Sequence, residues 1–155
     1  MTRVEKVVQK LHSELTSKNI LEVACGCGEF SIAASKYAEA VHAIDLDAAR
    51  LFPEAENIPN LEFQRMDAAN MTFADQSFDA IVMYNAIGHL AGIIGNVLSE
   101  CLRVLKRGGS LYIISSFRID KCYIAVSLIP CLEGKHICFE LNTDEIFVYI
   151  KVTHE

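Results

Sequence analysis

An apolar strand, a glycine turn and the start of a helix follow one another over residues 21–30, which read Leu-Glu-Val-Ala-Cys-Gly-Cys-Gly-Glu-Phe. Residues 31–38 continue with helical spacing of their apolar side chains. Gly26 and Gly28 have no Cβ, so a ligand can lie directly against the main chain there. The free N–H groups at the start of the helix point to the same place. This arrangement predicts a turn that binds a small molecule.

One acidic residue, Glu22, lies inside the predicted strand, four residues before Gly26. A carboxylate in a buried strand is costly unless it has a partner. A ligand with polar or cationic groups would be such a partner. We therefore expect Glu22 to form an acidic wall of the binding turn.

Length and charge narrow the class of protein. The 155 residues are enough for one domain, which we assign to residues 1–155, with a sizeable buried core. The net charge of −6 argues against a nucleic-acid partner. No apolar run approaches the roughly 20 residues of a membrane span. Because residues 1–8 lack the apolar region of a signal peptide, we expect a cytoplasmic location and no membrane partner.

The cysteines do not indicate a metal site. Cys25 and Cys27 are one residue apart, whereas common zinc knuckles leave two residues between cysteines. We interpret all six as small, mostly buried apolar residues and expect no bound metal. The alternative is a soft ion or metalloid held by Cys122, Cys131 and Cys138.

Apolar periodicity predicts alternating strands and helices along most of the chain. The expected strands are residues 19–23, 40–47, 61–65, 78–84 and 110–115, followed by a hairpin of 136–141 and 145–152. The expected helices are residues 4–15, 31–40, 48–56 with Pro53 interrupting it, and 87–105 ended by the glycines 108 and 109. Residues 117–135 suggest only a short helix before Gly134.

This alternation is typical of an α/β protein with a Rossmann-like, doubly wound sheet. We expect seven mostly parallel strands with helices on both faces and a C-terminal antiparallel hairpin at the edge. The nearly continuous apolar strands at 79–84 and 111–114 fit a buried central sheet. In such sheets, ligands bind at the carboxyl ends of the strands, where the strand order reverses.

Each early strand ends in a residue that can contact a ligand. After the glycine turn come Asp45, Asp67 and Asn85, at the ends of the second, third and fourth strands. A carboxylate such as Asp45 can accept both hydroxyls of a ribose. Asp67 can accept from a base amino group beside the N–H of Ala68. Together these residues describe a site for a nucleoside.

Each of these residues also has a structural interpretation. Asp45 and Asp67 can serve as helix N-caps or loop acids, and Asp47 suits the cap of the following helix. Asn85 can satisfy backbone groups at the end of a strand. His89 can be an ordinary histidine at the start of a helix.

With these residues in place, the chain resembles the class I S-adenosylmethionine-dependent methyltransferases, especially those acting on small molecules. Four stretches in order carry the resemblance: the glycine turn at 21–28, the acid-ended strand at 41–47, the loop and strand at 65–82, and the helix, turn and strand at 101–114. Together they cover residues of about 20–115.

The resemblance implies S-adenosylmethionine as the cofactor and assigns roles to individual residues. Glu22 would accept from the cofactor's amino group, directly or through water, and Asp45 would hold the ribose hydroxyls. Asp67 would accept from the adenine amino group, while Asn85 would line the pocket near the sulfonium. The cofactor-binding set is Glu22, Ala24, Gly26, Gly28, Asp45, Leu46, Asp67, Ala68 and Asn85.

Two departures from the family pattern affect the expectations. Ala24 stands where the family usually has its first glycine, and a methyl group is tolerated there if φ is negative. The segments that often form a substrate lid are short or lacking. We therefore expect a minimal lid, with an acceptor site that is either open or completed by a second subunit in a homodimer.

The reaction implied is transfer of a methyl group to a small-molecule acceptor by in-line displacement. A base is needed only where the acceptor must lose a proton, and His89 is the first candidate and Tyr84 the second. Two alternatives remain. One is a non-catalytic S-adenosylmethionine-binding sensor or subunit. The other is an NAD-dependent oxidoreductase, although Ser31 replaces its third glycine and Glu22 stands in its first strand.

Overall fold

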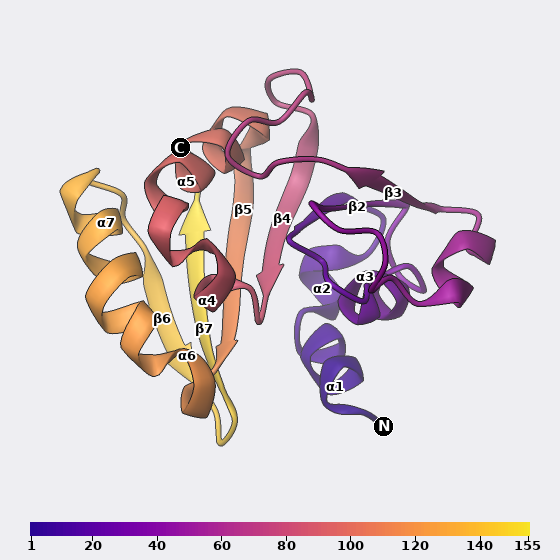
Figure 1. Cartoon of the computed structure of the whole chain (residues 1–155), viewed down its shortest axis with the longest axis horizontal. Helices are drawn as coiled ribbons and strands as arrows, with labels where there is room; N and C mark the ends of the chain where they lie inside the picture. Colours follow the sequence, from indigo (N-terminus) through magenta and orange to yellow (C-terminus); the bar gives the residue numbers. More distant parts are fainter.

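Seven strands form one sheet in the order β3-β2-β1-β4-β5-β7-β6, as the computed structural model of residues 1–155 shows (Figure 1). The first five strands are parallel, and β7 runs antiparallel to both β5 and β6. This confirms the predicted doubly wound sheet with its antiparallel hairpin. The strands are β1 Asn19–Val23, β2 Ala40–Asp45, β3 Leu61–Arg65, β4 Phe78–Tyr84, β5 Leu105–Ser116, β6 Glu140–Thr143 and β7 Phe147–Thr153.

Helical segments cover both faces of the sheet (Figure 1). None of them combines the length and apolar composition that crossing a membrane requires. They are α1 Arg3–Lys10, α2 His12–Leu15, α3 Glu29–Ala34, η1 Pro53–Asn57, α4 Ile87–Leu90, η2 Ala91–Ile93, α5 Ile94–Val104, α6 Phe117–Tyr123, η3 Ile124–Leu128 and α7 Ile129–Gly134.

The sheet separates two apolar cores. Successive side chains of a strand point to opposite faces, so β4 sends Ala80 and Val82 to one core and Ile81 and Met83 to the other. The first core holds α1, α2 and α3 against the sheet, and the second holds α4, α5, η3 and α7. Both faces of the central strands are therefore buried, which is why β4 is apolar at almost every position.

The helix expected at 48–56 is reduced to the 3₁₀ helix η1. Pro53 restricts the residue before it, and Phe52 is extended with φ −63° and ψ 134°. Residues 48–51 are turns and bends, so the carboxylate of Asp47 accepts from Ala49 N–H at 2.9 Å in a turn and does not cap a helix. The segment after β2 is therefore an irregular loop.

The long helix expected at 87–105 is also interrupted. Ile93 (φ −127°, ψ 15°) leaves helical geometry before α5, and the short 3₁₀ helix η2 separates α4 from it. Helix α5 ends at Val104, and the predicted glycine C-cap is absent because residues 106–109 already belong to β5.

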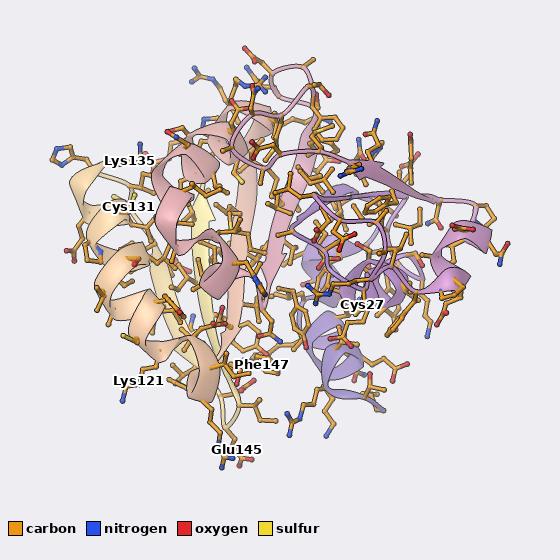
Figure 2. All side chains as sticks on the ribbon, viewed as in Figure 1. Cys27, Lys121, Cys131, Lys135, Glu145 and Phe147 are labelled. Atoms are coloured by element: carbon orange, nitrogen blue, oxygen red, sulfur yellow. The ribbon has the colours of Figure 1, made fainter.

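The helical segment at 117–135 is longer than the sequence suggested. From α6 through α7 the positions Asp120, Ile124, Leu128 and Leu132 are buried at intervals of four residues, so one face packs on the sheet. Lys121 points away from the sheet on the opposite side (Figure 2). The hairpin begins at Glu140, four residues later than expected.

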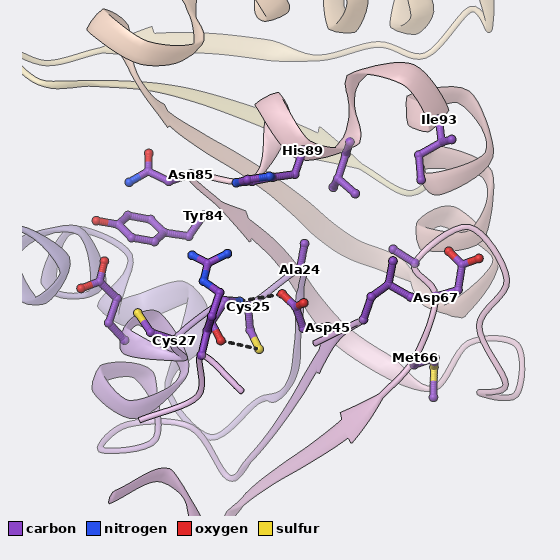
Figure 3. Close-up of a pocket in the computed structure, with 16 residues that line it drawn as sticks. Ala24, Cys25, Cys27, Asp45, Met66, Asp67, Tyr84, Asn85, His89 and Ile93 are labelled. Carbon is purple, nitrogen blue, oxygen red and sulfur yellow. Dashed lines mark hydrogen bonds between the residues drawn. The ribbon is translucent and has the colours of Figure 1, made fainter. Parts of the chain in front are cut away.

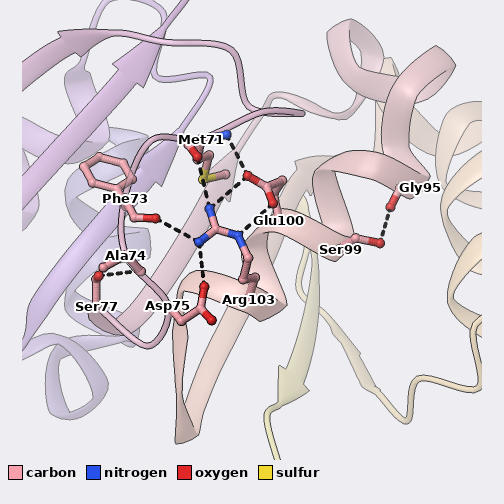
Figure 4. Close-up of polar contacts among 9 residues, drawn as sticks. All are labelled: Met71, Phe73, Ala74, Asp75, Ser77, Gly95, Ser99, Glu100 and Arg103. Carbon is pink, nitrogen blue, oxygen red and sulfur yellow. Dashed lines mark hydrogen bonds and ion pairs between the residues drawn. The ribbon is translucent and has the colours of Figure 1, made fainter.

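The Arg103 side chain fastens the loop that precedes β4 (Figure 4). Its guanidinium donates to the carbonyl oxygens of Met71 (3.0 Å) and Phe73 (2.8 Å), and to the carboxylates of Asp75 (2.8 Å) and Glu100 (2.8 and 3.0 Å). Glu100 in turn accepts from Met71 N–H at 2.6 Å. Helix α5 therefore holds the loop that continues from the end of β3.

We predict that Arg103→Lys lowers the free energy of unfolding by about 1–3 kcal/mol, because an ammonium group cannot replace a planar fork that reaches four partners. Denaturant titration measures this loss, and hydrogen exchange should accelerate selectively in residues 71–77. Arg107 is exposed and forms no ion pair, so Arg107→Lys is the control. Equal stability of the two variants would contradict the role given to Arg103.

Candidate functional site

A cavity of about 380 Å³ opens at the carboxyl ends of β1, β2, β3 and β4 (Figure 3). This is the point where the strand order reverses between β1 and β4. Helix α4 and η2 form the other side. The lining residues are Ala24, Cys25, Gly26, Cys27, Glu29, Asp45, Leu46, Arg50, Met66, Asp67, Ala68, Tyr84, Asn85, His89, Leu90 and Ile93.

Eight of the ten residues proposed from sequence lie in this lining, although they come from four separate strand ends and from helix α4. Parallel strands bring their carboxyl ends to one edge, which explains the convergence. The eight are Ala24, Gly26, Asp45, Leu46, Asp67, Ala68, Asn85 and His89. Glu22 and Gly28 are outside the lining.

Glu22 is buried beneath the turn, with 1% of its surface exposed, and its partner is part of the chain. One carboxylate oxygen accepts from the Ser31 N–H at 3.1 Å and from the Ser31 hydroxyl at 2.6 Å. Burial raises the pKa of Glu22 to about 8, and the Ser31 donors only partly oppose this rise. The expected acidic wall of the cavity is therefore wrong: Glu22 supports the turn from below by holding the first turn of α3.

Gly28 is needed for packing and not for access to the cavity. It caps α3 with φ +81°, and its N–H donates to Cys25 O at 2.9 Å. A Cβ at this position would meet Leu51 Cδ1 at 2.9 Å. A side chain there would combine a strained backbone with a clash.

Asp45 connects the end of β2 with the turn after β1. Its Oδ2 accepts from Gly26 N–H at 2.8 Å and its Oδ1 from Asp47 N–H at 3.0 Å. The Gly26 N–H is therefore already bonded within the chain and is not a free donor in the cavity. Each carboxylate oxygen still has a second lone pair, so the Asp45 carboxylate can also accept hydroxyl groups in the cavity.

Ala24 adopts a left-handed backbone with φ +55°, whereas the sequence suggested that a negative φ would accommodate its methyl group. An L-residue with a Cβ pays a steric cost in this region. The turn leaves β1 too sharply for an ordinary backbone, since Cys25 N–H must reach Ile44 O at 3.0 Å on the neighbouring strand.

Asp67 and Ala68 lie together after β3. Asp67 Oδ1 accepts from Ala69 N–H at 2.9 Å, which orients the exposed carboxylate at the cavity. No hydrogen bond within the chain uses the Ala68 N–H. This pair offers one acceptor and one donor side by side, as the nucleoside interpretation requires.

Asn85 satisfies backbone at a strand end and is also part of the cavity lining. It adopts φ +50°, and its Oδ1 accepts from Ser116 N–H at 3.0 Å, which joins the ends of β4 and β5. Its side chain also lines the cavity, as does exposed His89 one turn along on α4 (Figure 3).

The other eight lining residues were not among the binding residues predicted from the sequence. Arg50 was expected on a helix, and only the loop conformation after β2 places it at the cavity. Tyr84 ends β4, and burial raises its pKa to about 12, so its hydroxyl stays protonated near neutral pH and is a poor base. Cys25 is buried, which raises the pKa of its thiol, and all six cysteines are free. Met66 directly precedes Asp67 in the sequence, and this neighbourhood could have predicted its place in the lining.

We predict that Glu22→Gln removes part of the chain's pH dependence of stability. An unfolded glutamate titrates near about 4.3, so between that pH and about 8 the folded state holds more protons. The free energy of unfolding must then fall as the pH rises through this window. A neutral glutamine does not lose stability in this way. The Tm of Glu22→Gln minus the Tm of wild type should therefore be higher at pH 8 than at pH 5, by at least about 2 °C. A constant difference would show that Glu22 is ionised in the folded state.

Ala24→Gly should stabilise the fold. The left-handed conformation costs an alanine roughly 1–2 kcal/mol, which exceeds the roughly 0.5–1 kcal/mol of extra chain entropy that glycine loses on folding. The expected gain is about 0.5–1 kcal/mol by denaturant titration. The matched control is Ala125→Gly on the exposed side of η3, which should destabilise. A loss of stability in both variants would refute the strain at Ala24.

Comparison with known proteins places the chain in a family. A family model described as a methyltransferase domain matches residues 20–109. The phthiotriol/phenolphthiotriol dimycocerosates methyltransferase 1 of Mycobacterium ulcerans is 37% identical over 107 residues, 64% of this chain and 38% of that protein. A probable S-adenosylmethionine-dependent methyltransferase of Mycolicibacterium smegmatis is 29% identical over 117 residues, 76% of this chain and 45% of that protein. The chain thus spans less than half the length of these curated relatives.

Solved structures share the fold over nearly the whole chain. A SAM-dependent methyltransferase from Aquifex aeolicus superimposes with a TM-score of 0.79 and 19% identity, covering 97% of this chain and 88% of that one. The N-methyltransferase NodS from Bradyrhizobium japonicum gives a TM-score of 0.75 and 18% identity, covering 99% and 95%. Because the family model spans more than half of the residues and includes the whole glycine turn, the chain belongs to the class I S-adenosylmethionine-dependent methyltransferase family.

Proposed function

We propose that the chain transfers a methyl group from S-adenosylmethionine to a small-molecule acceptor. The observation that carries this proposal is the convergence of Gly26, Asp45, Asp67 and Asn85 on one cavity at the switch point of a methyltransferase-family sheet. The curated relative from M. ulcerans is named for methylating phthiotriol and phenolphthiotriol dimycocerosates, which supports a small-molecule acceptor.

The cavity fits the chemistry of this cofactor. Its volume of about 380 Å³ is in the range of small-molecule sites. Asp45 retains free lone pairs for two vicinal hydroxyls, and Asp67 with the Ala68 N–H provides an acceptor and a donor for the edge of an adenine. Gly26 lines the cavity without a side chain, and the Arg50 guanidinium lies beside it, with Nη2 3.3 Å from the place of the missing Cβ.

The cofactor supplies an activated methyl group on a positively charged sulfur, so the chain's main contribution is alignment. Holding the acceptor, the methyl carbon and the sulfur in line is worth about 7–11 kcal/mol of the barrier through proximity and orientation. Asn85, fixed by its bond to Ser116 N–H, and the aromatic ring of Tyr84 shape the part of the cavity beside α4.

His89 is the group available to take a proton from an acceptor. It lies on α4 in the lining of the cavity and is exposed, so it can reach a bound acceptor. Burial raises the pKa of Tyr84 to about 12, which makes its hydroxyl a less suitable base than His89. We propose His89 as the general base for acceptors that must be deprotonated.

The family model and the curated relatives are methyltransferases and support neither alternative. The oxidoreductase interpretation has a structural objection as well. Ser31, in the place of its third glycine, is fixed in a buried bond to Glu22. A single domain over residues 1–155, a cytoplasmic location and a homodimer that completes the acceptor site stay predictions.

We expect a division of labour between Asp45 and His89. Asp45→Asn weakens one acceptor of the ribose hydroxyls, and should raise the Kd for S-adenosylmethionine and S-adenosylhomocysteine by about 10–100-fold in calorimetric titration. His89→Ala should leave these Kd values unchanged and lower kcat by about 10²–10⁴-fold with an acceptor that must lose a proton.

The matched control is Asp47→Asn, because Asp47 is exposed on the same loop and does not line the cavity. It should bind like wild type. Thermal unfolding of each variant separates loss of binding from loss of the Gly26 turn. Equal loss of cofactor binding in the Asp45 and His89 variants would refute the assignment, and wild type that binds neither cofactor form would refute the proposed function.

A further inference from the structure

We propose that Arg50 is the receptor for the α-carboxylate of the cofactor's amino-acid portion, an inference that rests on the proposed function. The residue lies on the irregular loop after β2, where the sequence predicted a helix, and its side chain lines the cavity. Its role follows from three features of the site: the use of the N–H groups in the glycine turn, the position of the guanidinium and the charge of the lining.

The glycine turn has few donors left for an anion. The Cys25, Gly26 and Gly28 N–H groups donate to Ile44 O, Asp45 Oδ2 and Cys25 O. Further along, the Ser31 N–H donates to the Glu22 carboxylate and the Ile32 N–H donates to Gly28 O. Only the N–H groups of Cys27, Glu29 and Phe30 remain, and these are uncharged. The turn itself therefore provides no positive charge to balance a carboxylate.

The Arg50 guanidinium lies directly against the bare main chain of this turn. Its Nη2 is 3.3 Å from the position that a Cβ on Gly26 would occupy. This is the place where the amino-acid portion of the cofactor must pass if it uses the glycine. Arg50 forms no ion pair and no hydrogen bond within the chain, so its whole planar fork is available to a carboxylate.

The charges of the lining favour such a cation beside a ligand carboxylate. Glu29, Asp45 and Asp67 place three carboxylates around the cavity, and Arg50 is the one lysine or arginine in the lining. A ligand carboxylate would be repelled by these groups unless a cation lay beside it. Arg3, whose charge lowers the pKa of Tyr84, is near the cavity but does not line it.

The test compares two ligands that differ in the amino-acid portion. S-Adenosylhomocysteine carries it, whereas 5′-methylthioadenosine has the adenosine and the sulfur without it. Arg50→Ala should raise the Kd for S-adenosylhomocysteine by about 10–100-fold, the loss of a charge-assisted paired hydrogen bond, and leave the Kd for 5′-methylthioadenosine unchanged. Arg50→Lys should bind S-adenosylhomocysteine with intermediate affinity, because it keeps the charge but loses the fork.

Two controls make the result specific. Arg107→Ala removes an equal charge from an exposed site outside the lining and should bind both ligands like wild type. Arg3→Ala tests the neighbouring cation, and a loss confined to this variant would overturn the assignment to Arg50. Equal weakening of both ligands by Arg50→Ala, or of neither, would also overturn it. Wild type that binds neither ligand would instead overturn the cofactor assignment on which the inference rests.

Discussion

The hydrogen bond from Gly26 N–H to the Asp45 carboxylate, at 2.8 Å, fixes the geometry on which the rest of the site depends. It joins the turn after β1 to the end of β2, and thereby sets the width of the cavity between them. The same bond consumes a donor that a glycine turn would otherwise present to a ligand. An anionic group of a ligand must then be bound by a positively charged side chain, and Arg50 lies in the cavity beside Gly26.

Below the turn, the Glu22 carboxylate and Ser31 form a second support outside the cavity lining. Serine at this position is small enough for the helix to approach the strand, and its hydroxyl and N–H satisfy a carboxyl group that would otherwise be unpaired in the core. The left-handed backbone of Ala24 lies between the two supports. The turn is therefore held from both sides in a conformation that its own sequence does not favour.

The elements that the sequence predicted best are the strands of the central sheet. β1 and β4 are apolar runs in the middle of the sheet, and the edge strand β3 alternates Leu61 and Phe63 with polar residues. All three have the expected limits. The helices differ more, because single residues with non-helical geometry, such as Phe52 before Pro53 or Ile93 before α5, interrupt patterns that are otherwise helical. The lining residues at strand ends followed from the parallel sheet, whereas Arg50 and Ile93 lie on segments whose path depends on these interruptions.

Order along the chain thus determined the doubly wound sheet, the switch point beside β1 and the strand-end groups Asp45, Asp67 and Asn85 that meet there. Periodicity and turn chemistry are local properties, and parallel pairing converts them into a shared edge. Only the tertiary structure decided which groups face the ligand. Glu22 turned out to be satisfied by Ser31, nine residues away, and Gly26 N–H by Asp45, nineteen residues away. Whether a polar group is free or already bonded depends on partners that packing brings together, and these partners cannot be predicted from the sequence pattern.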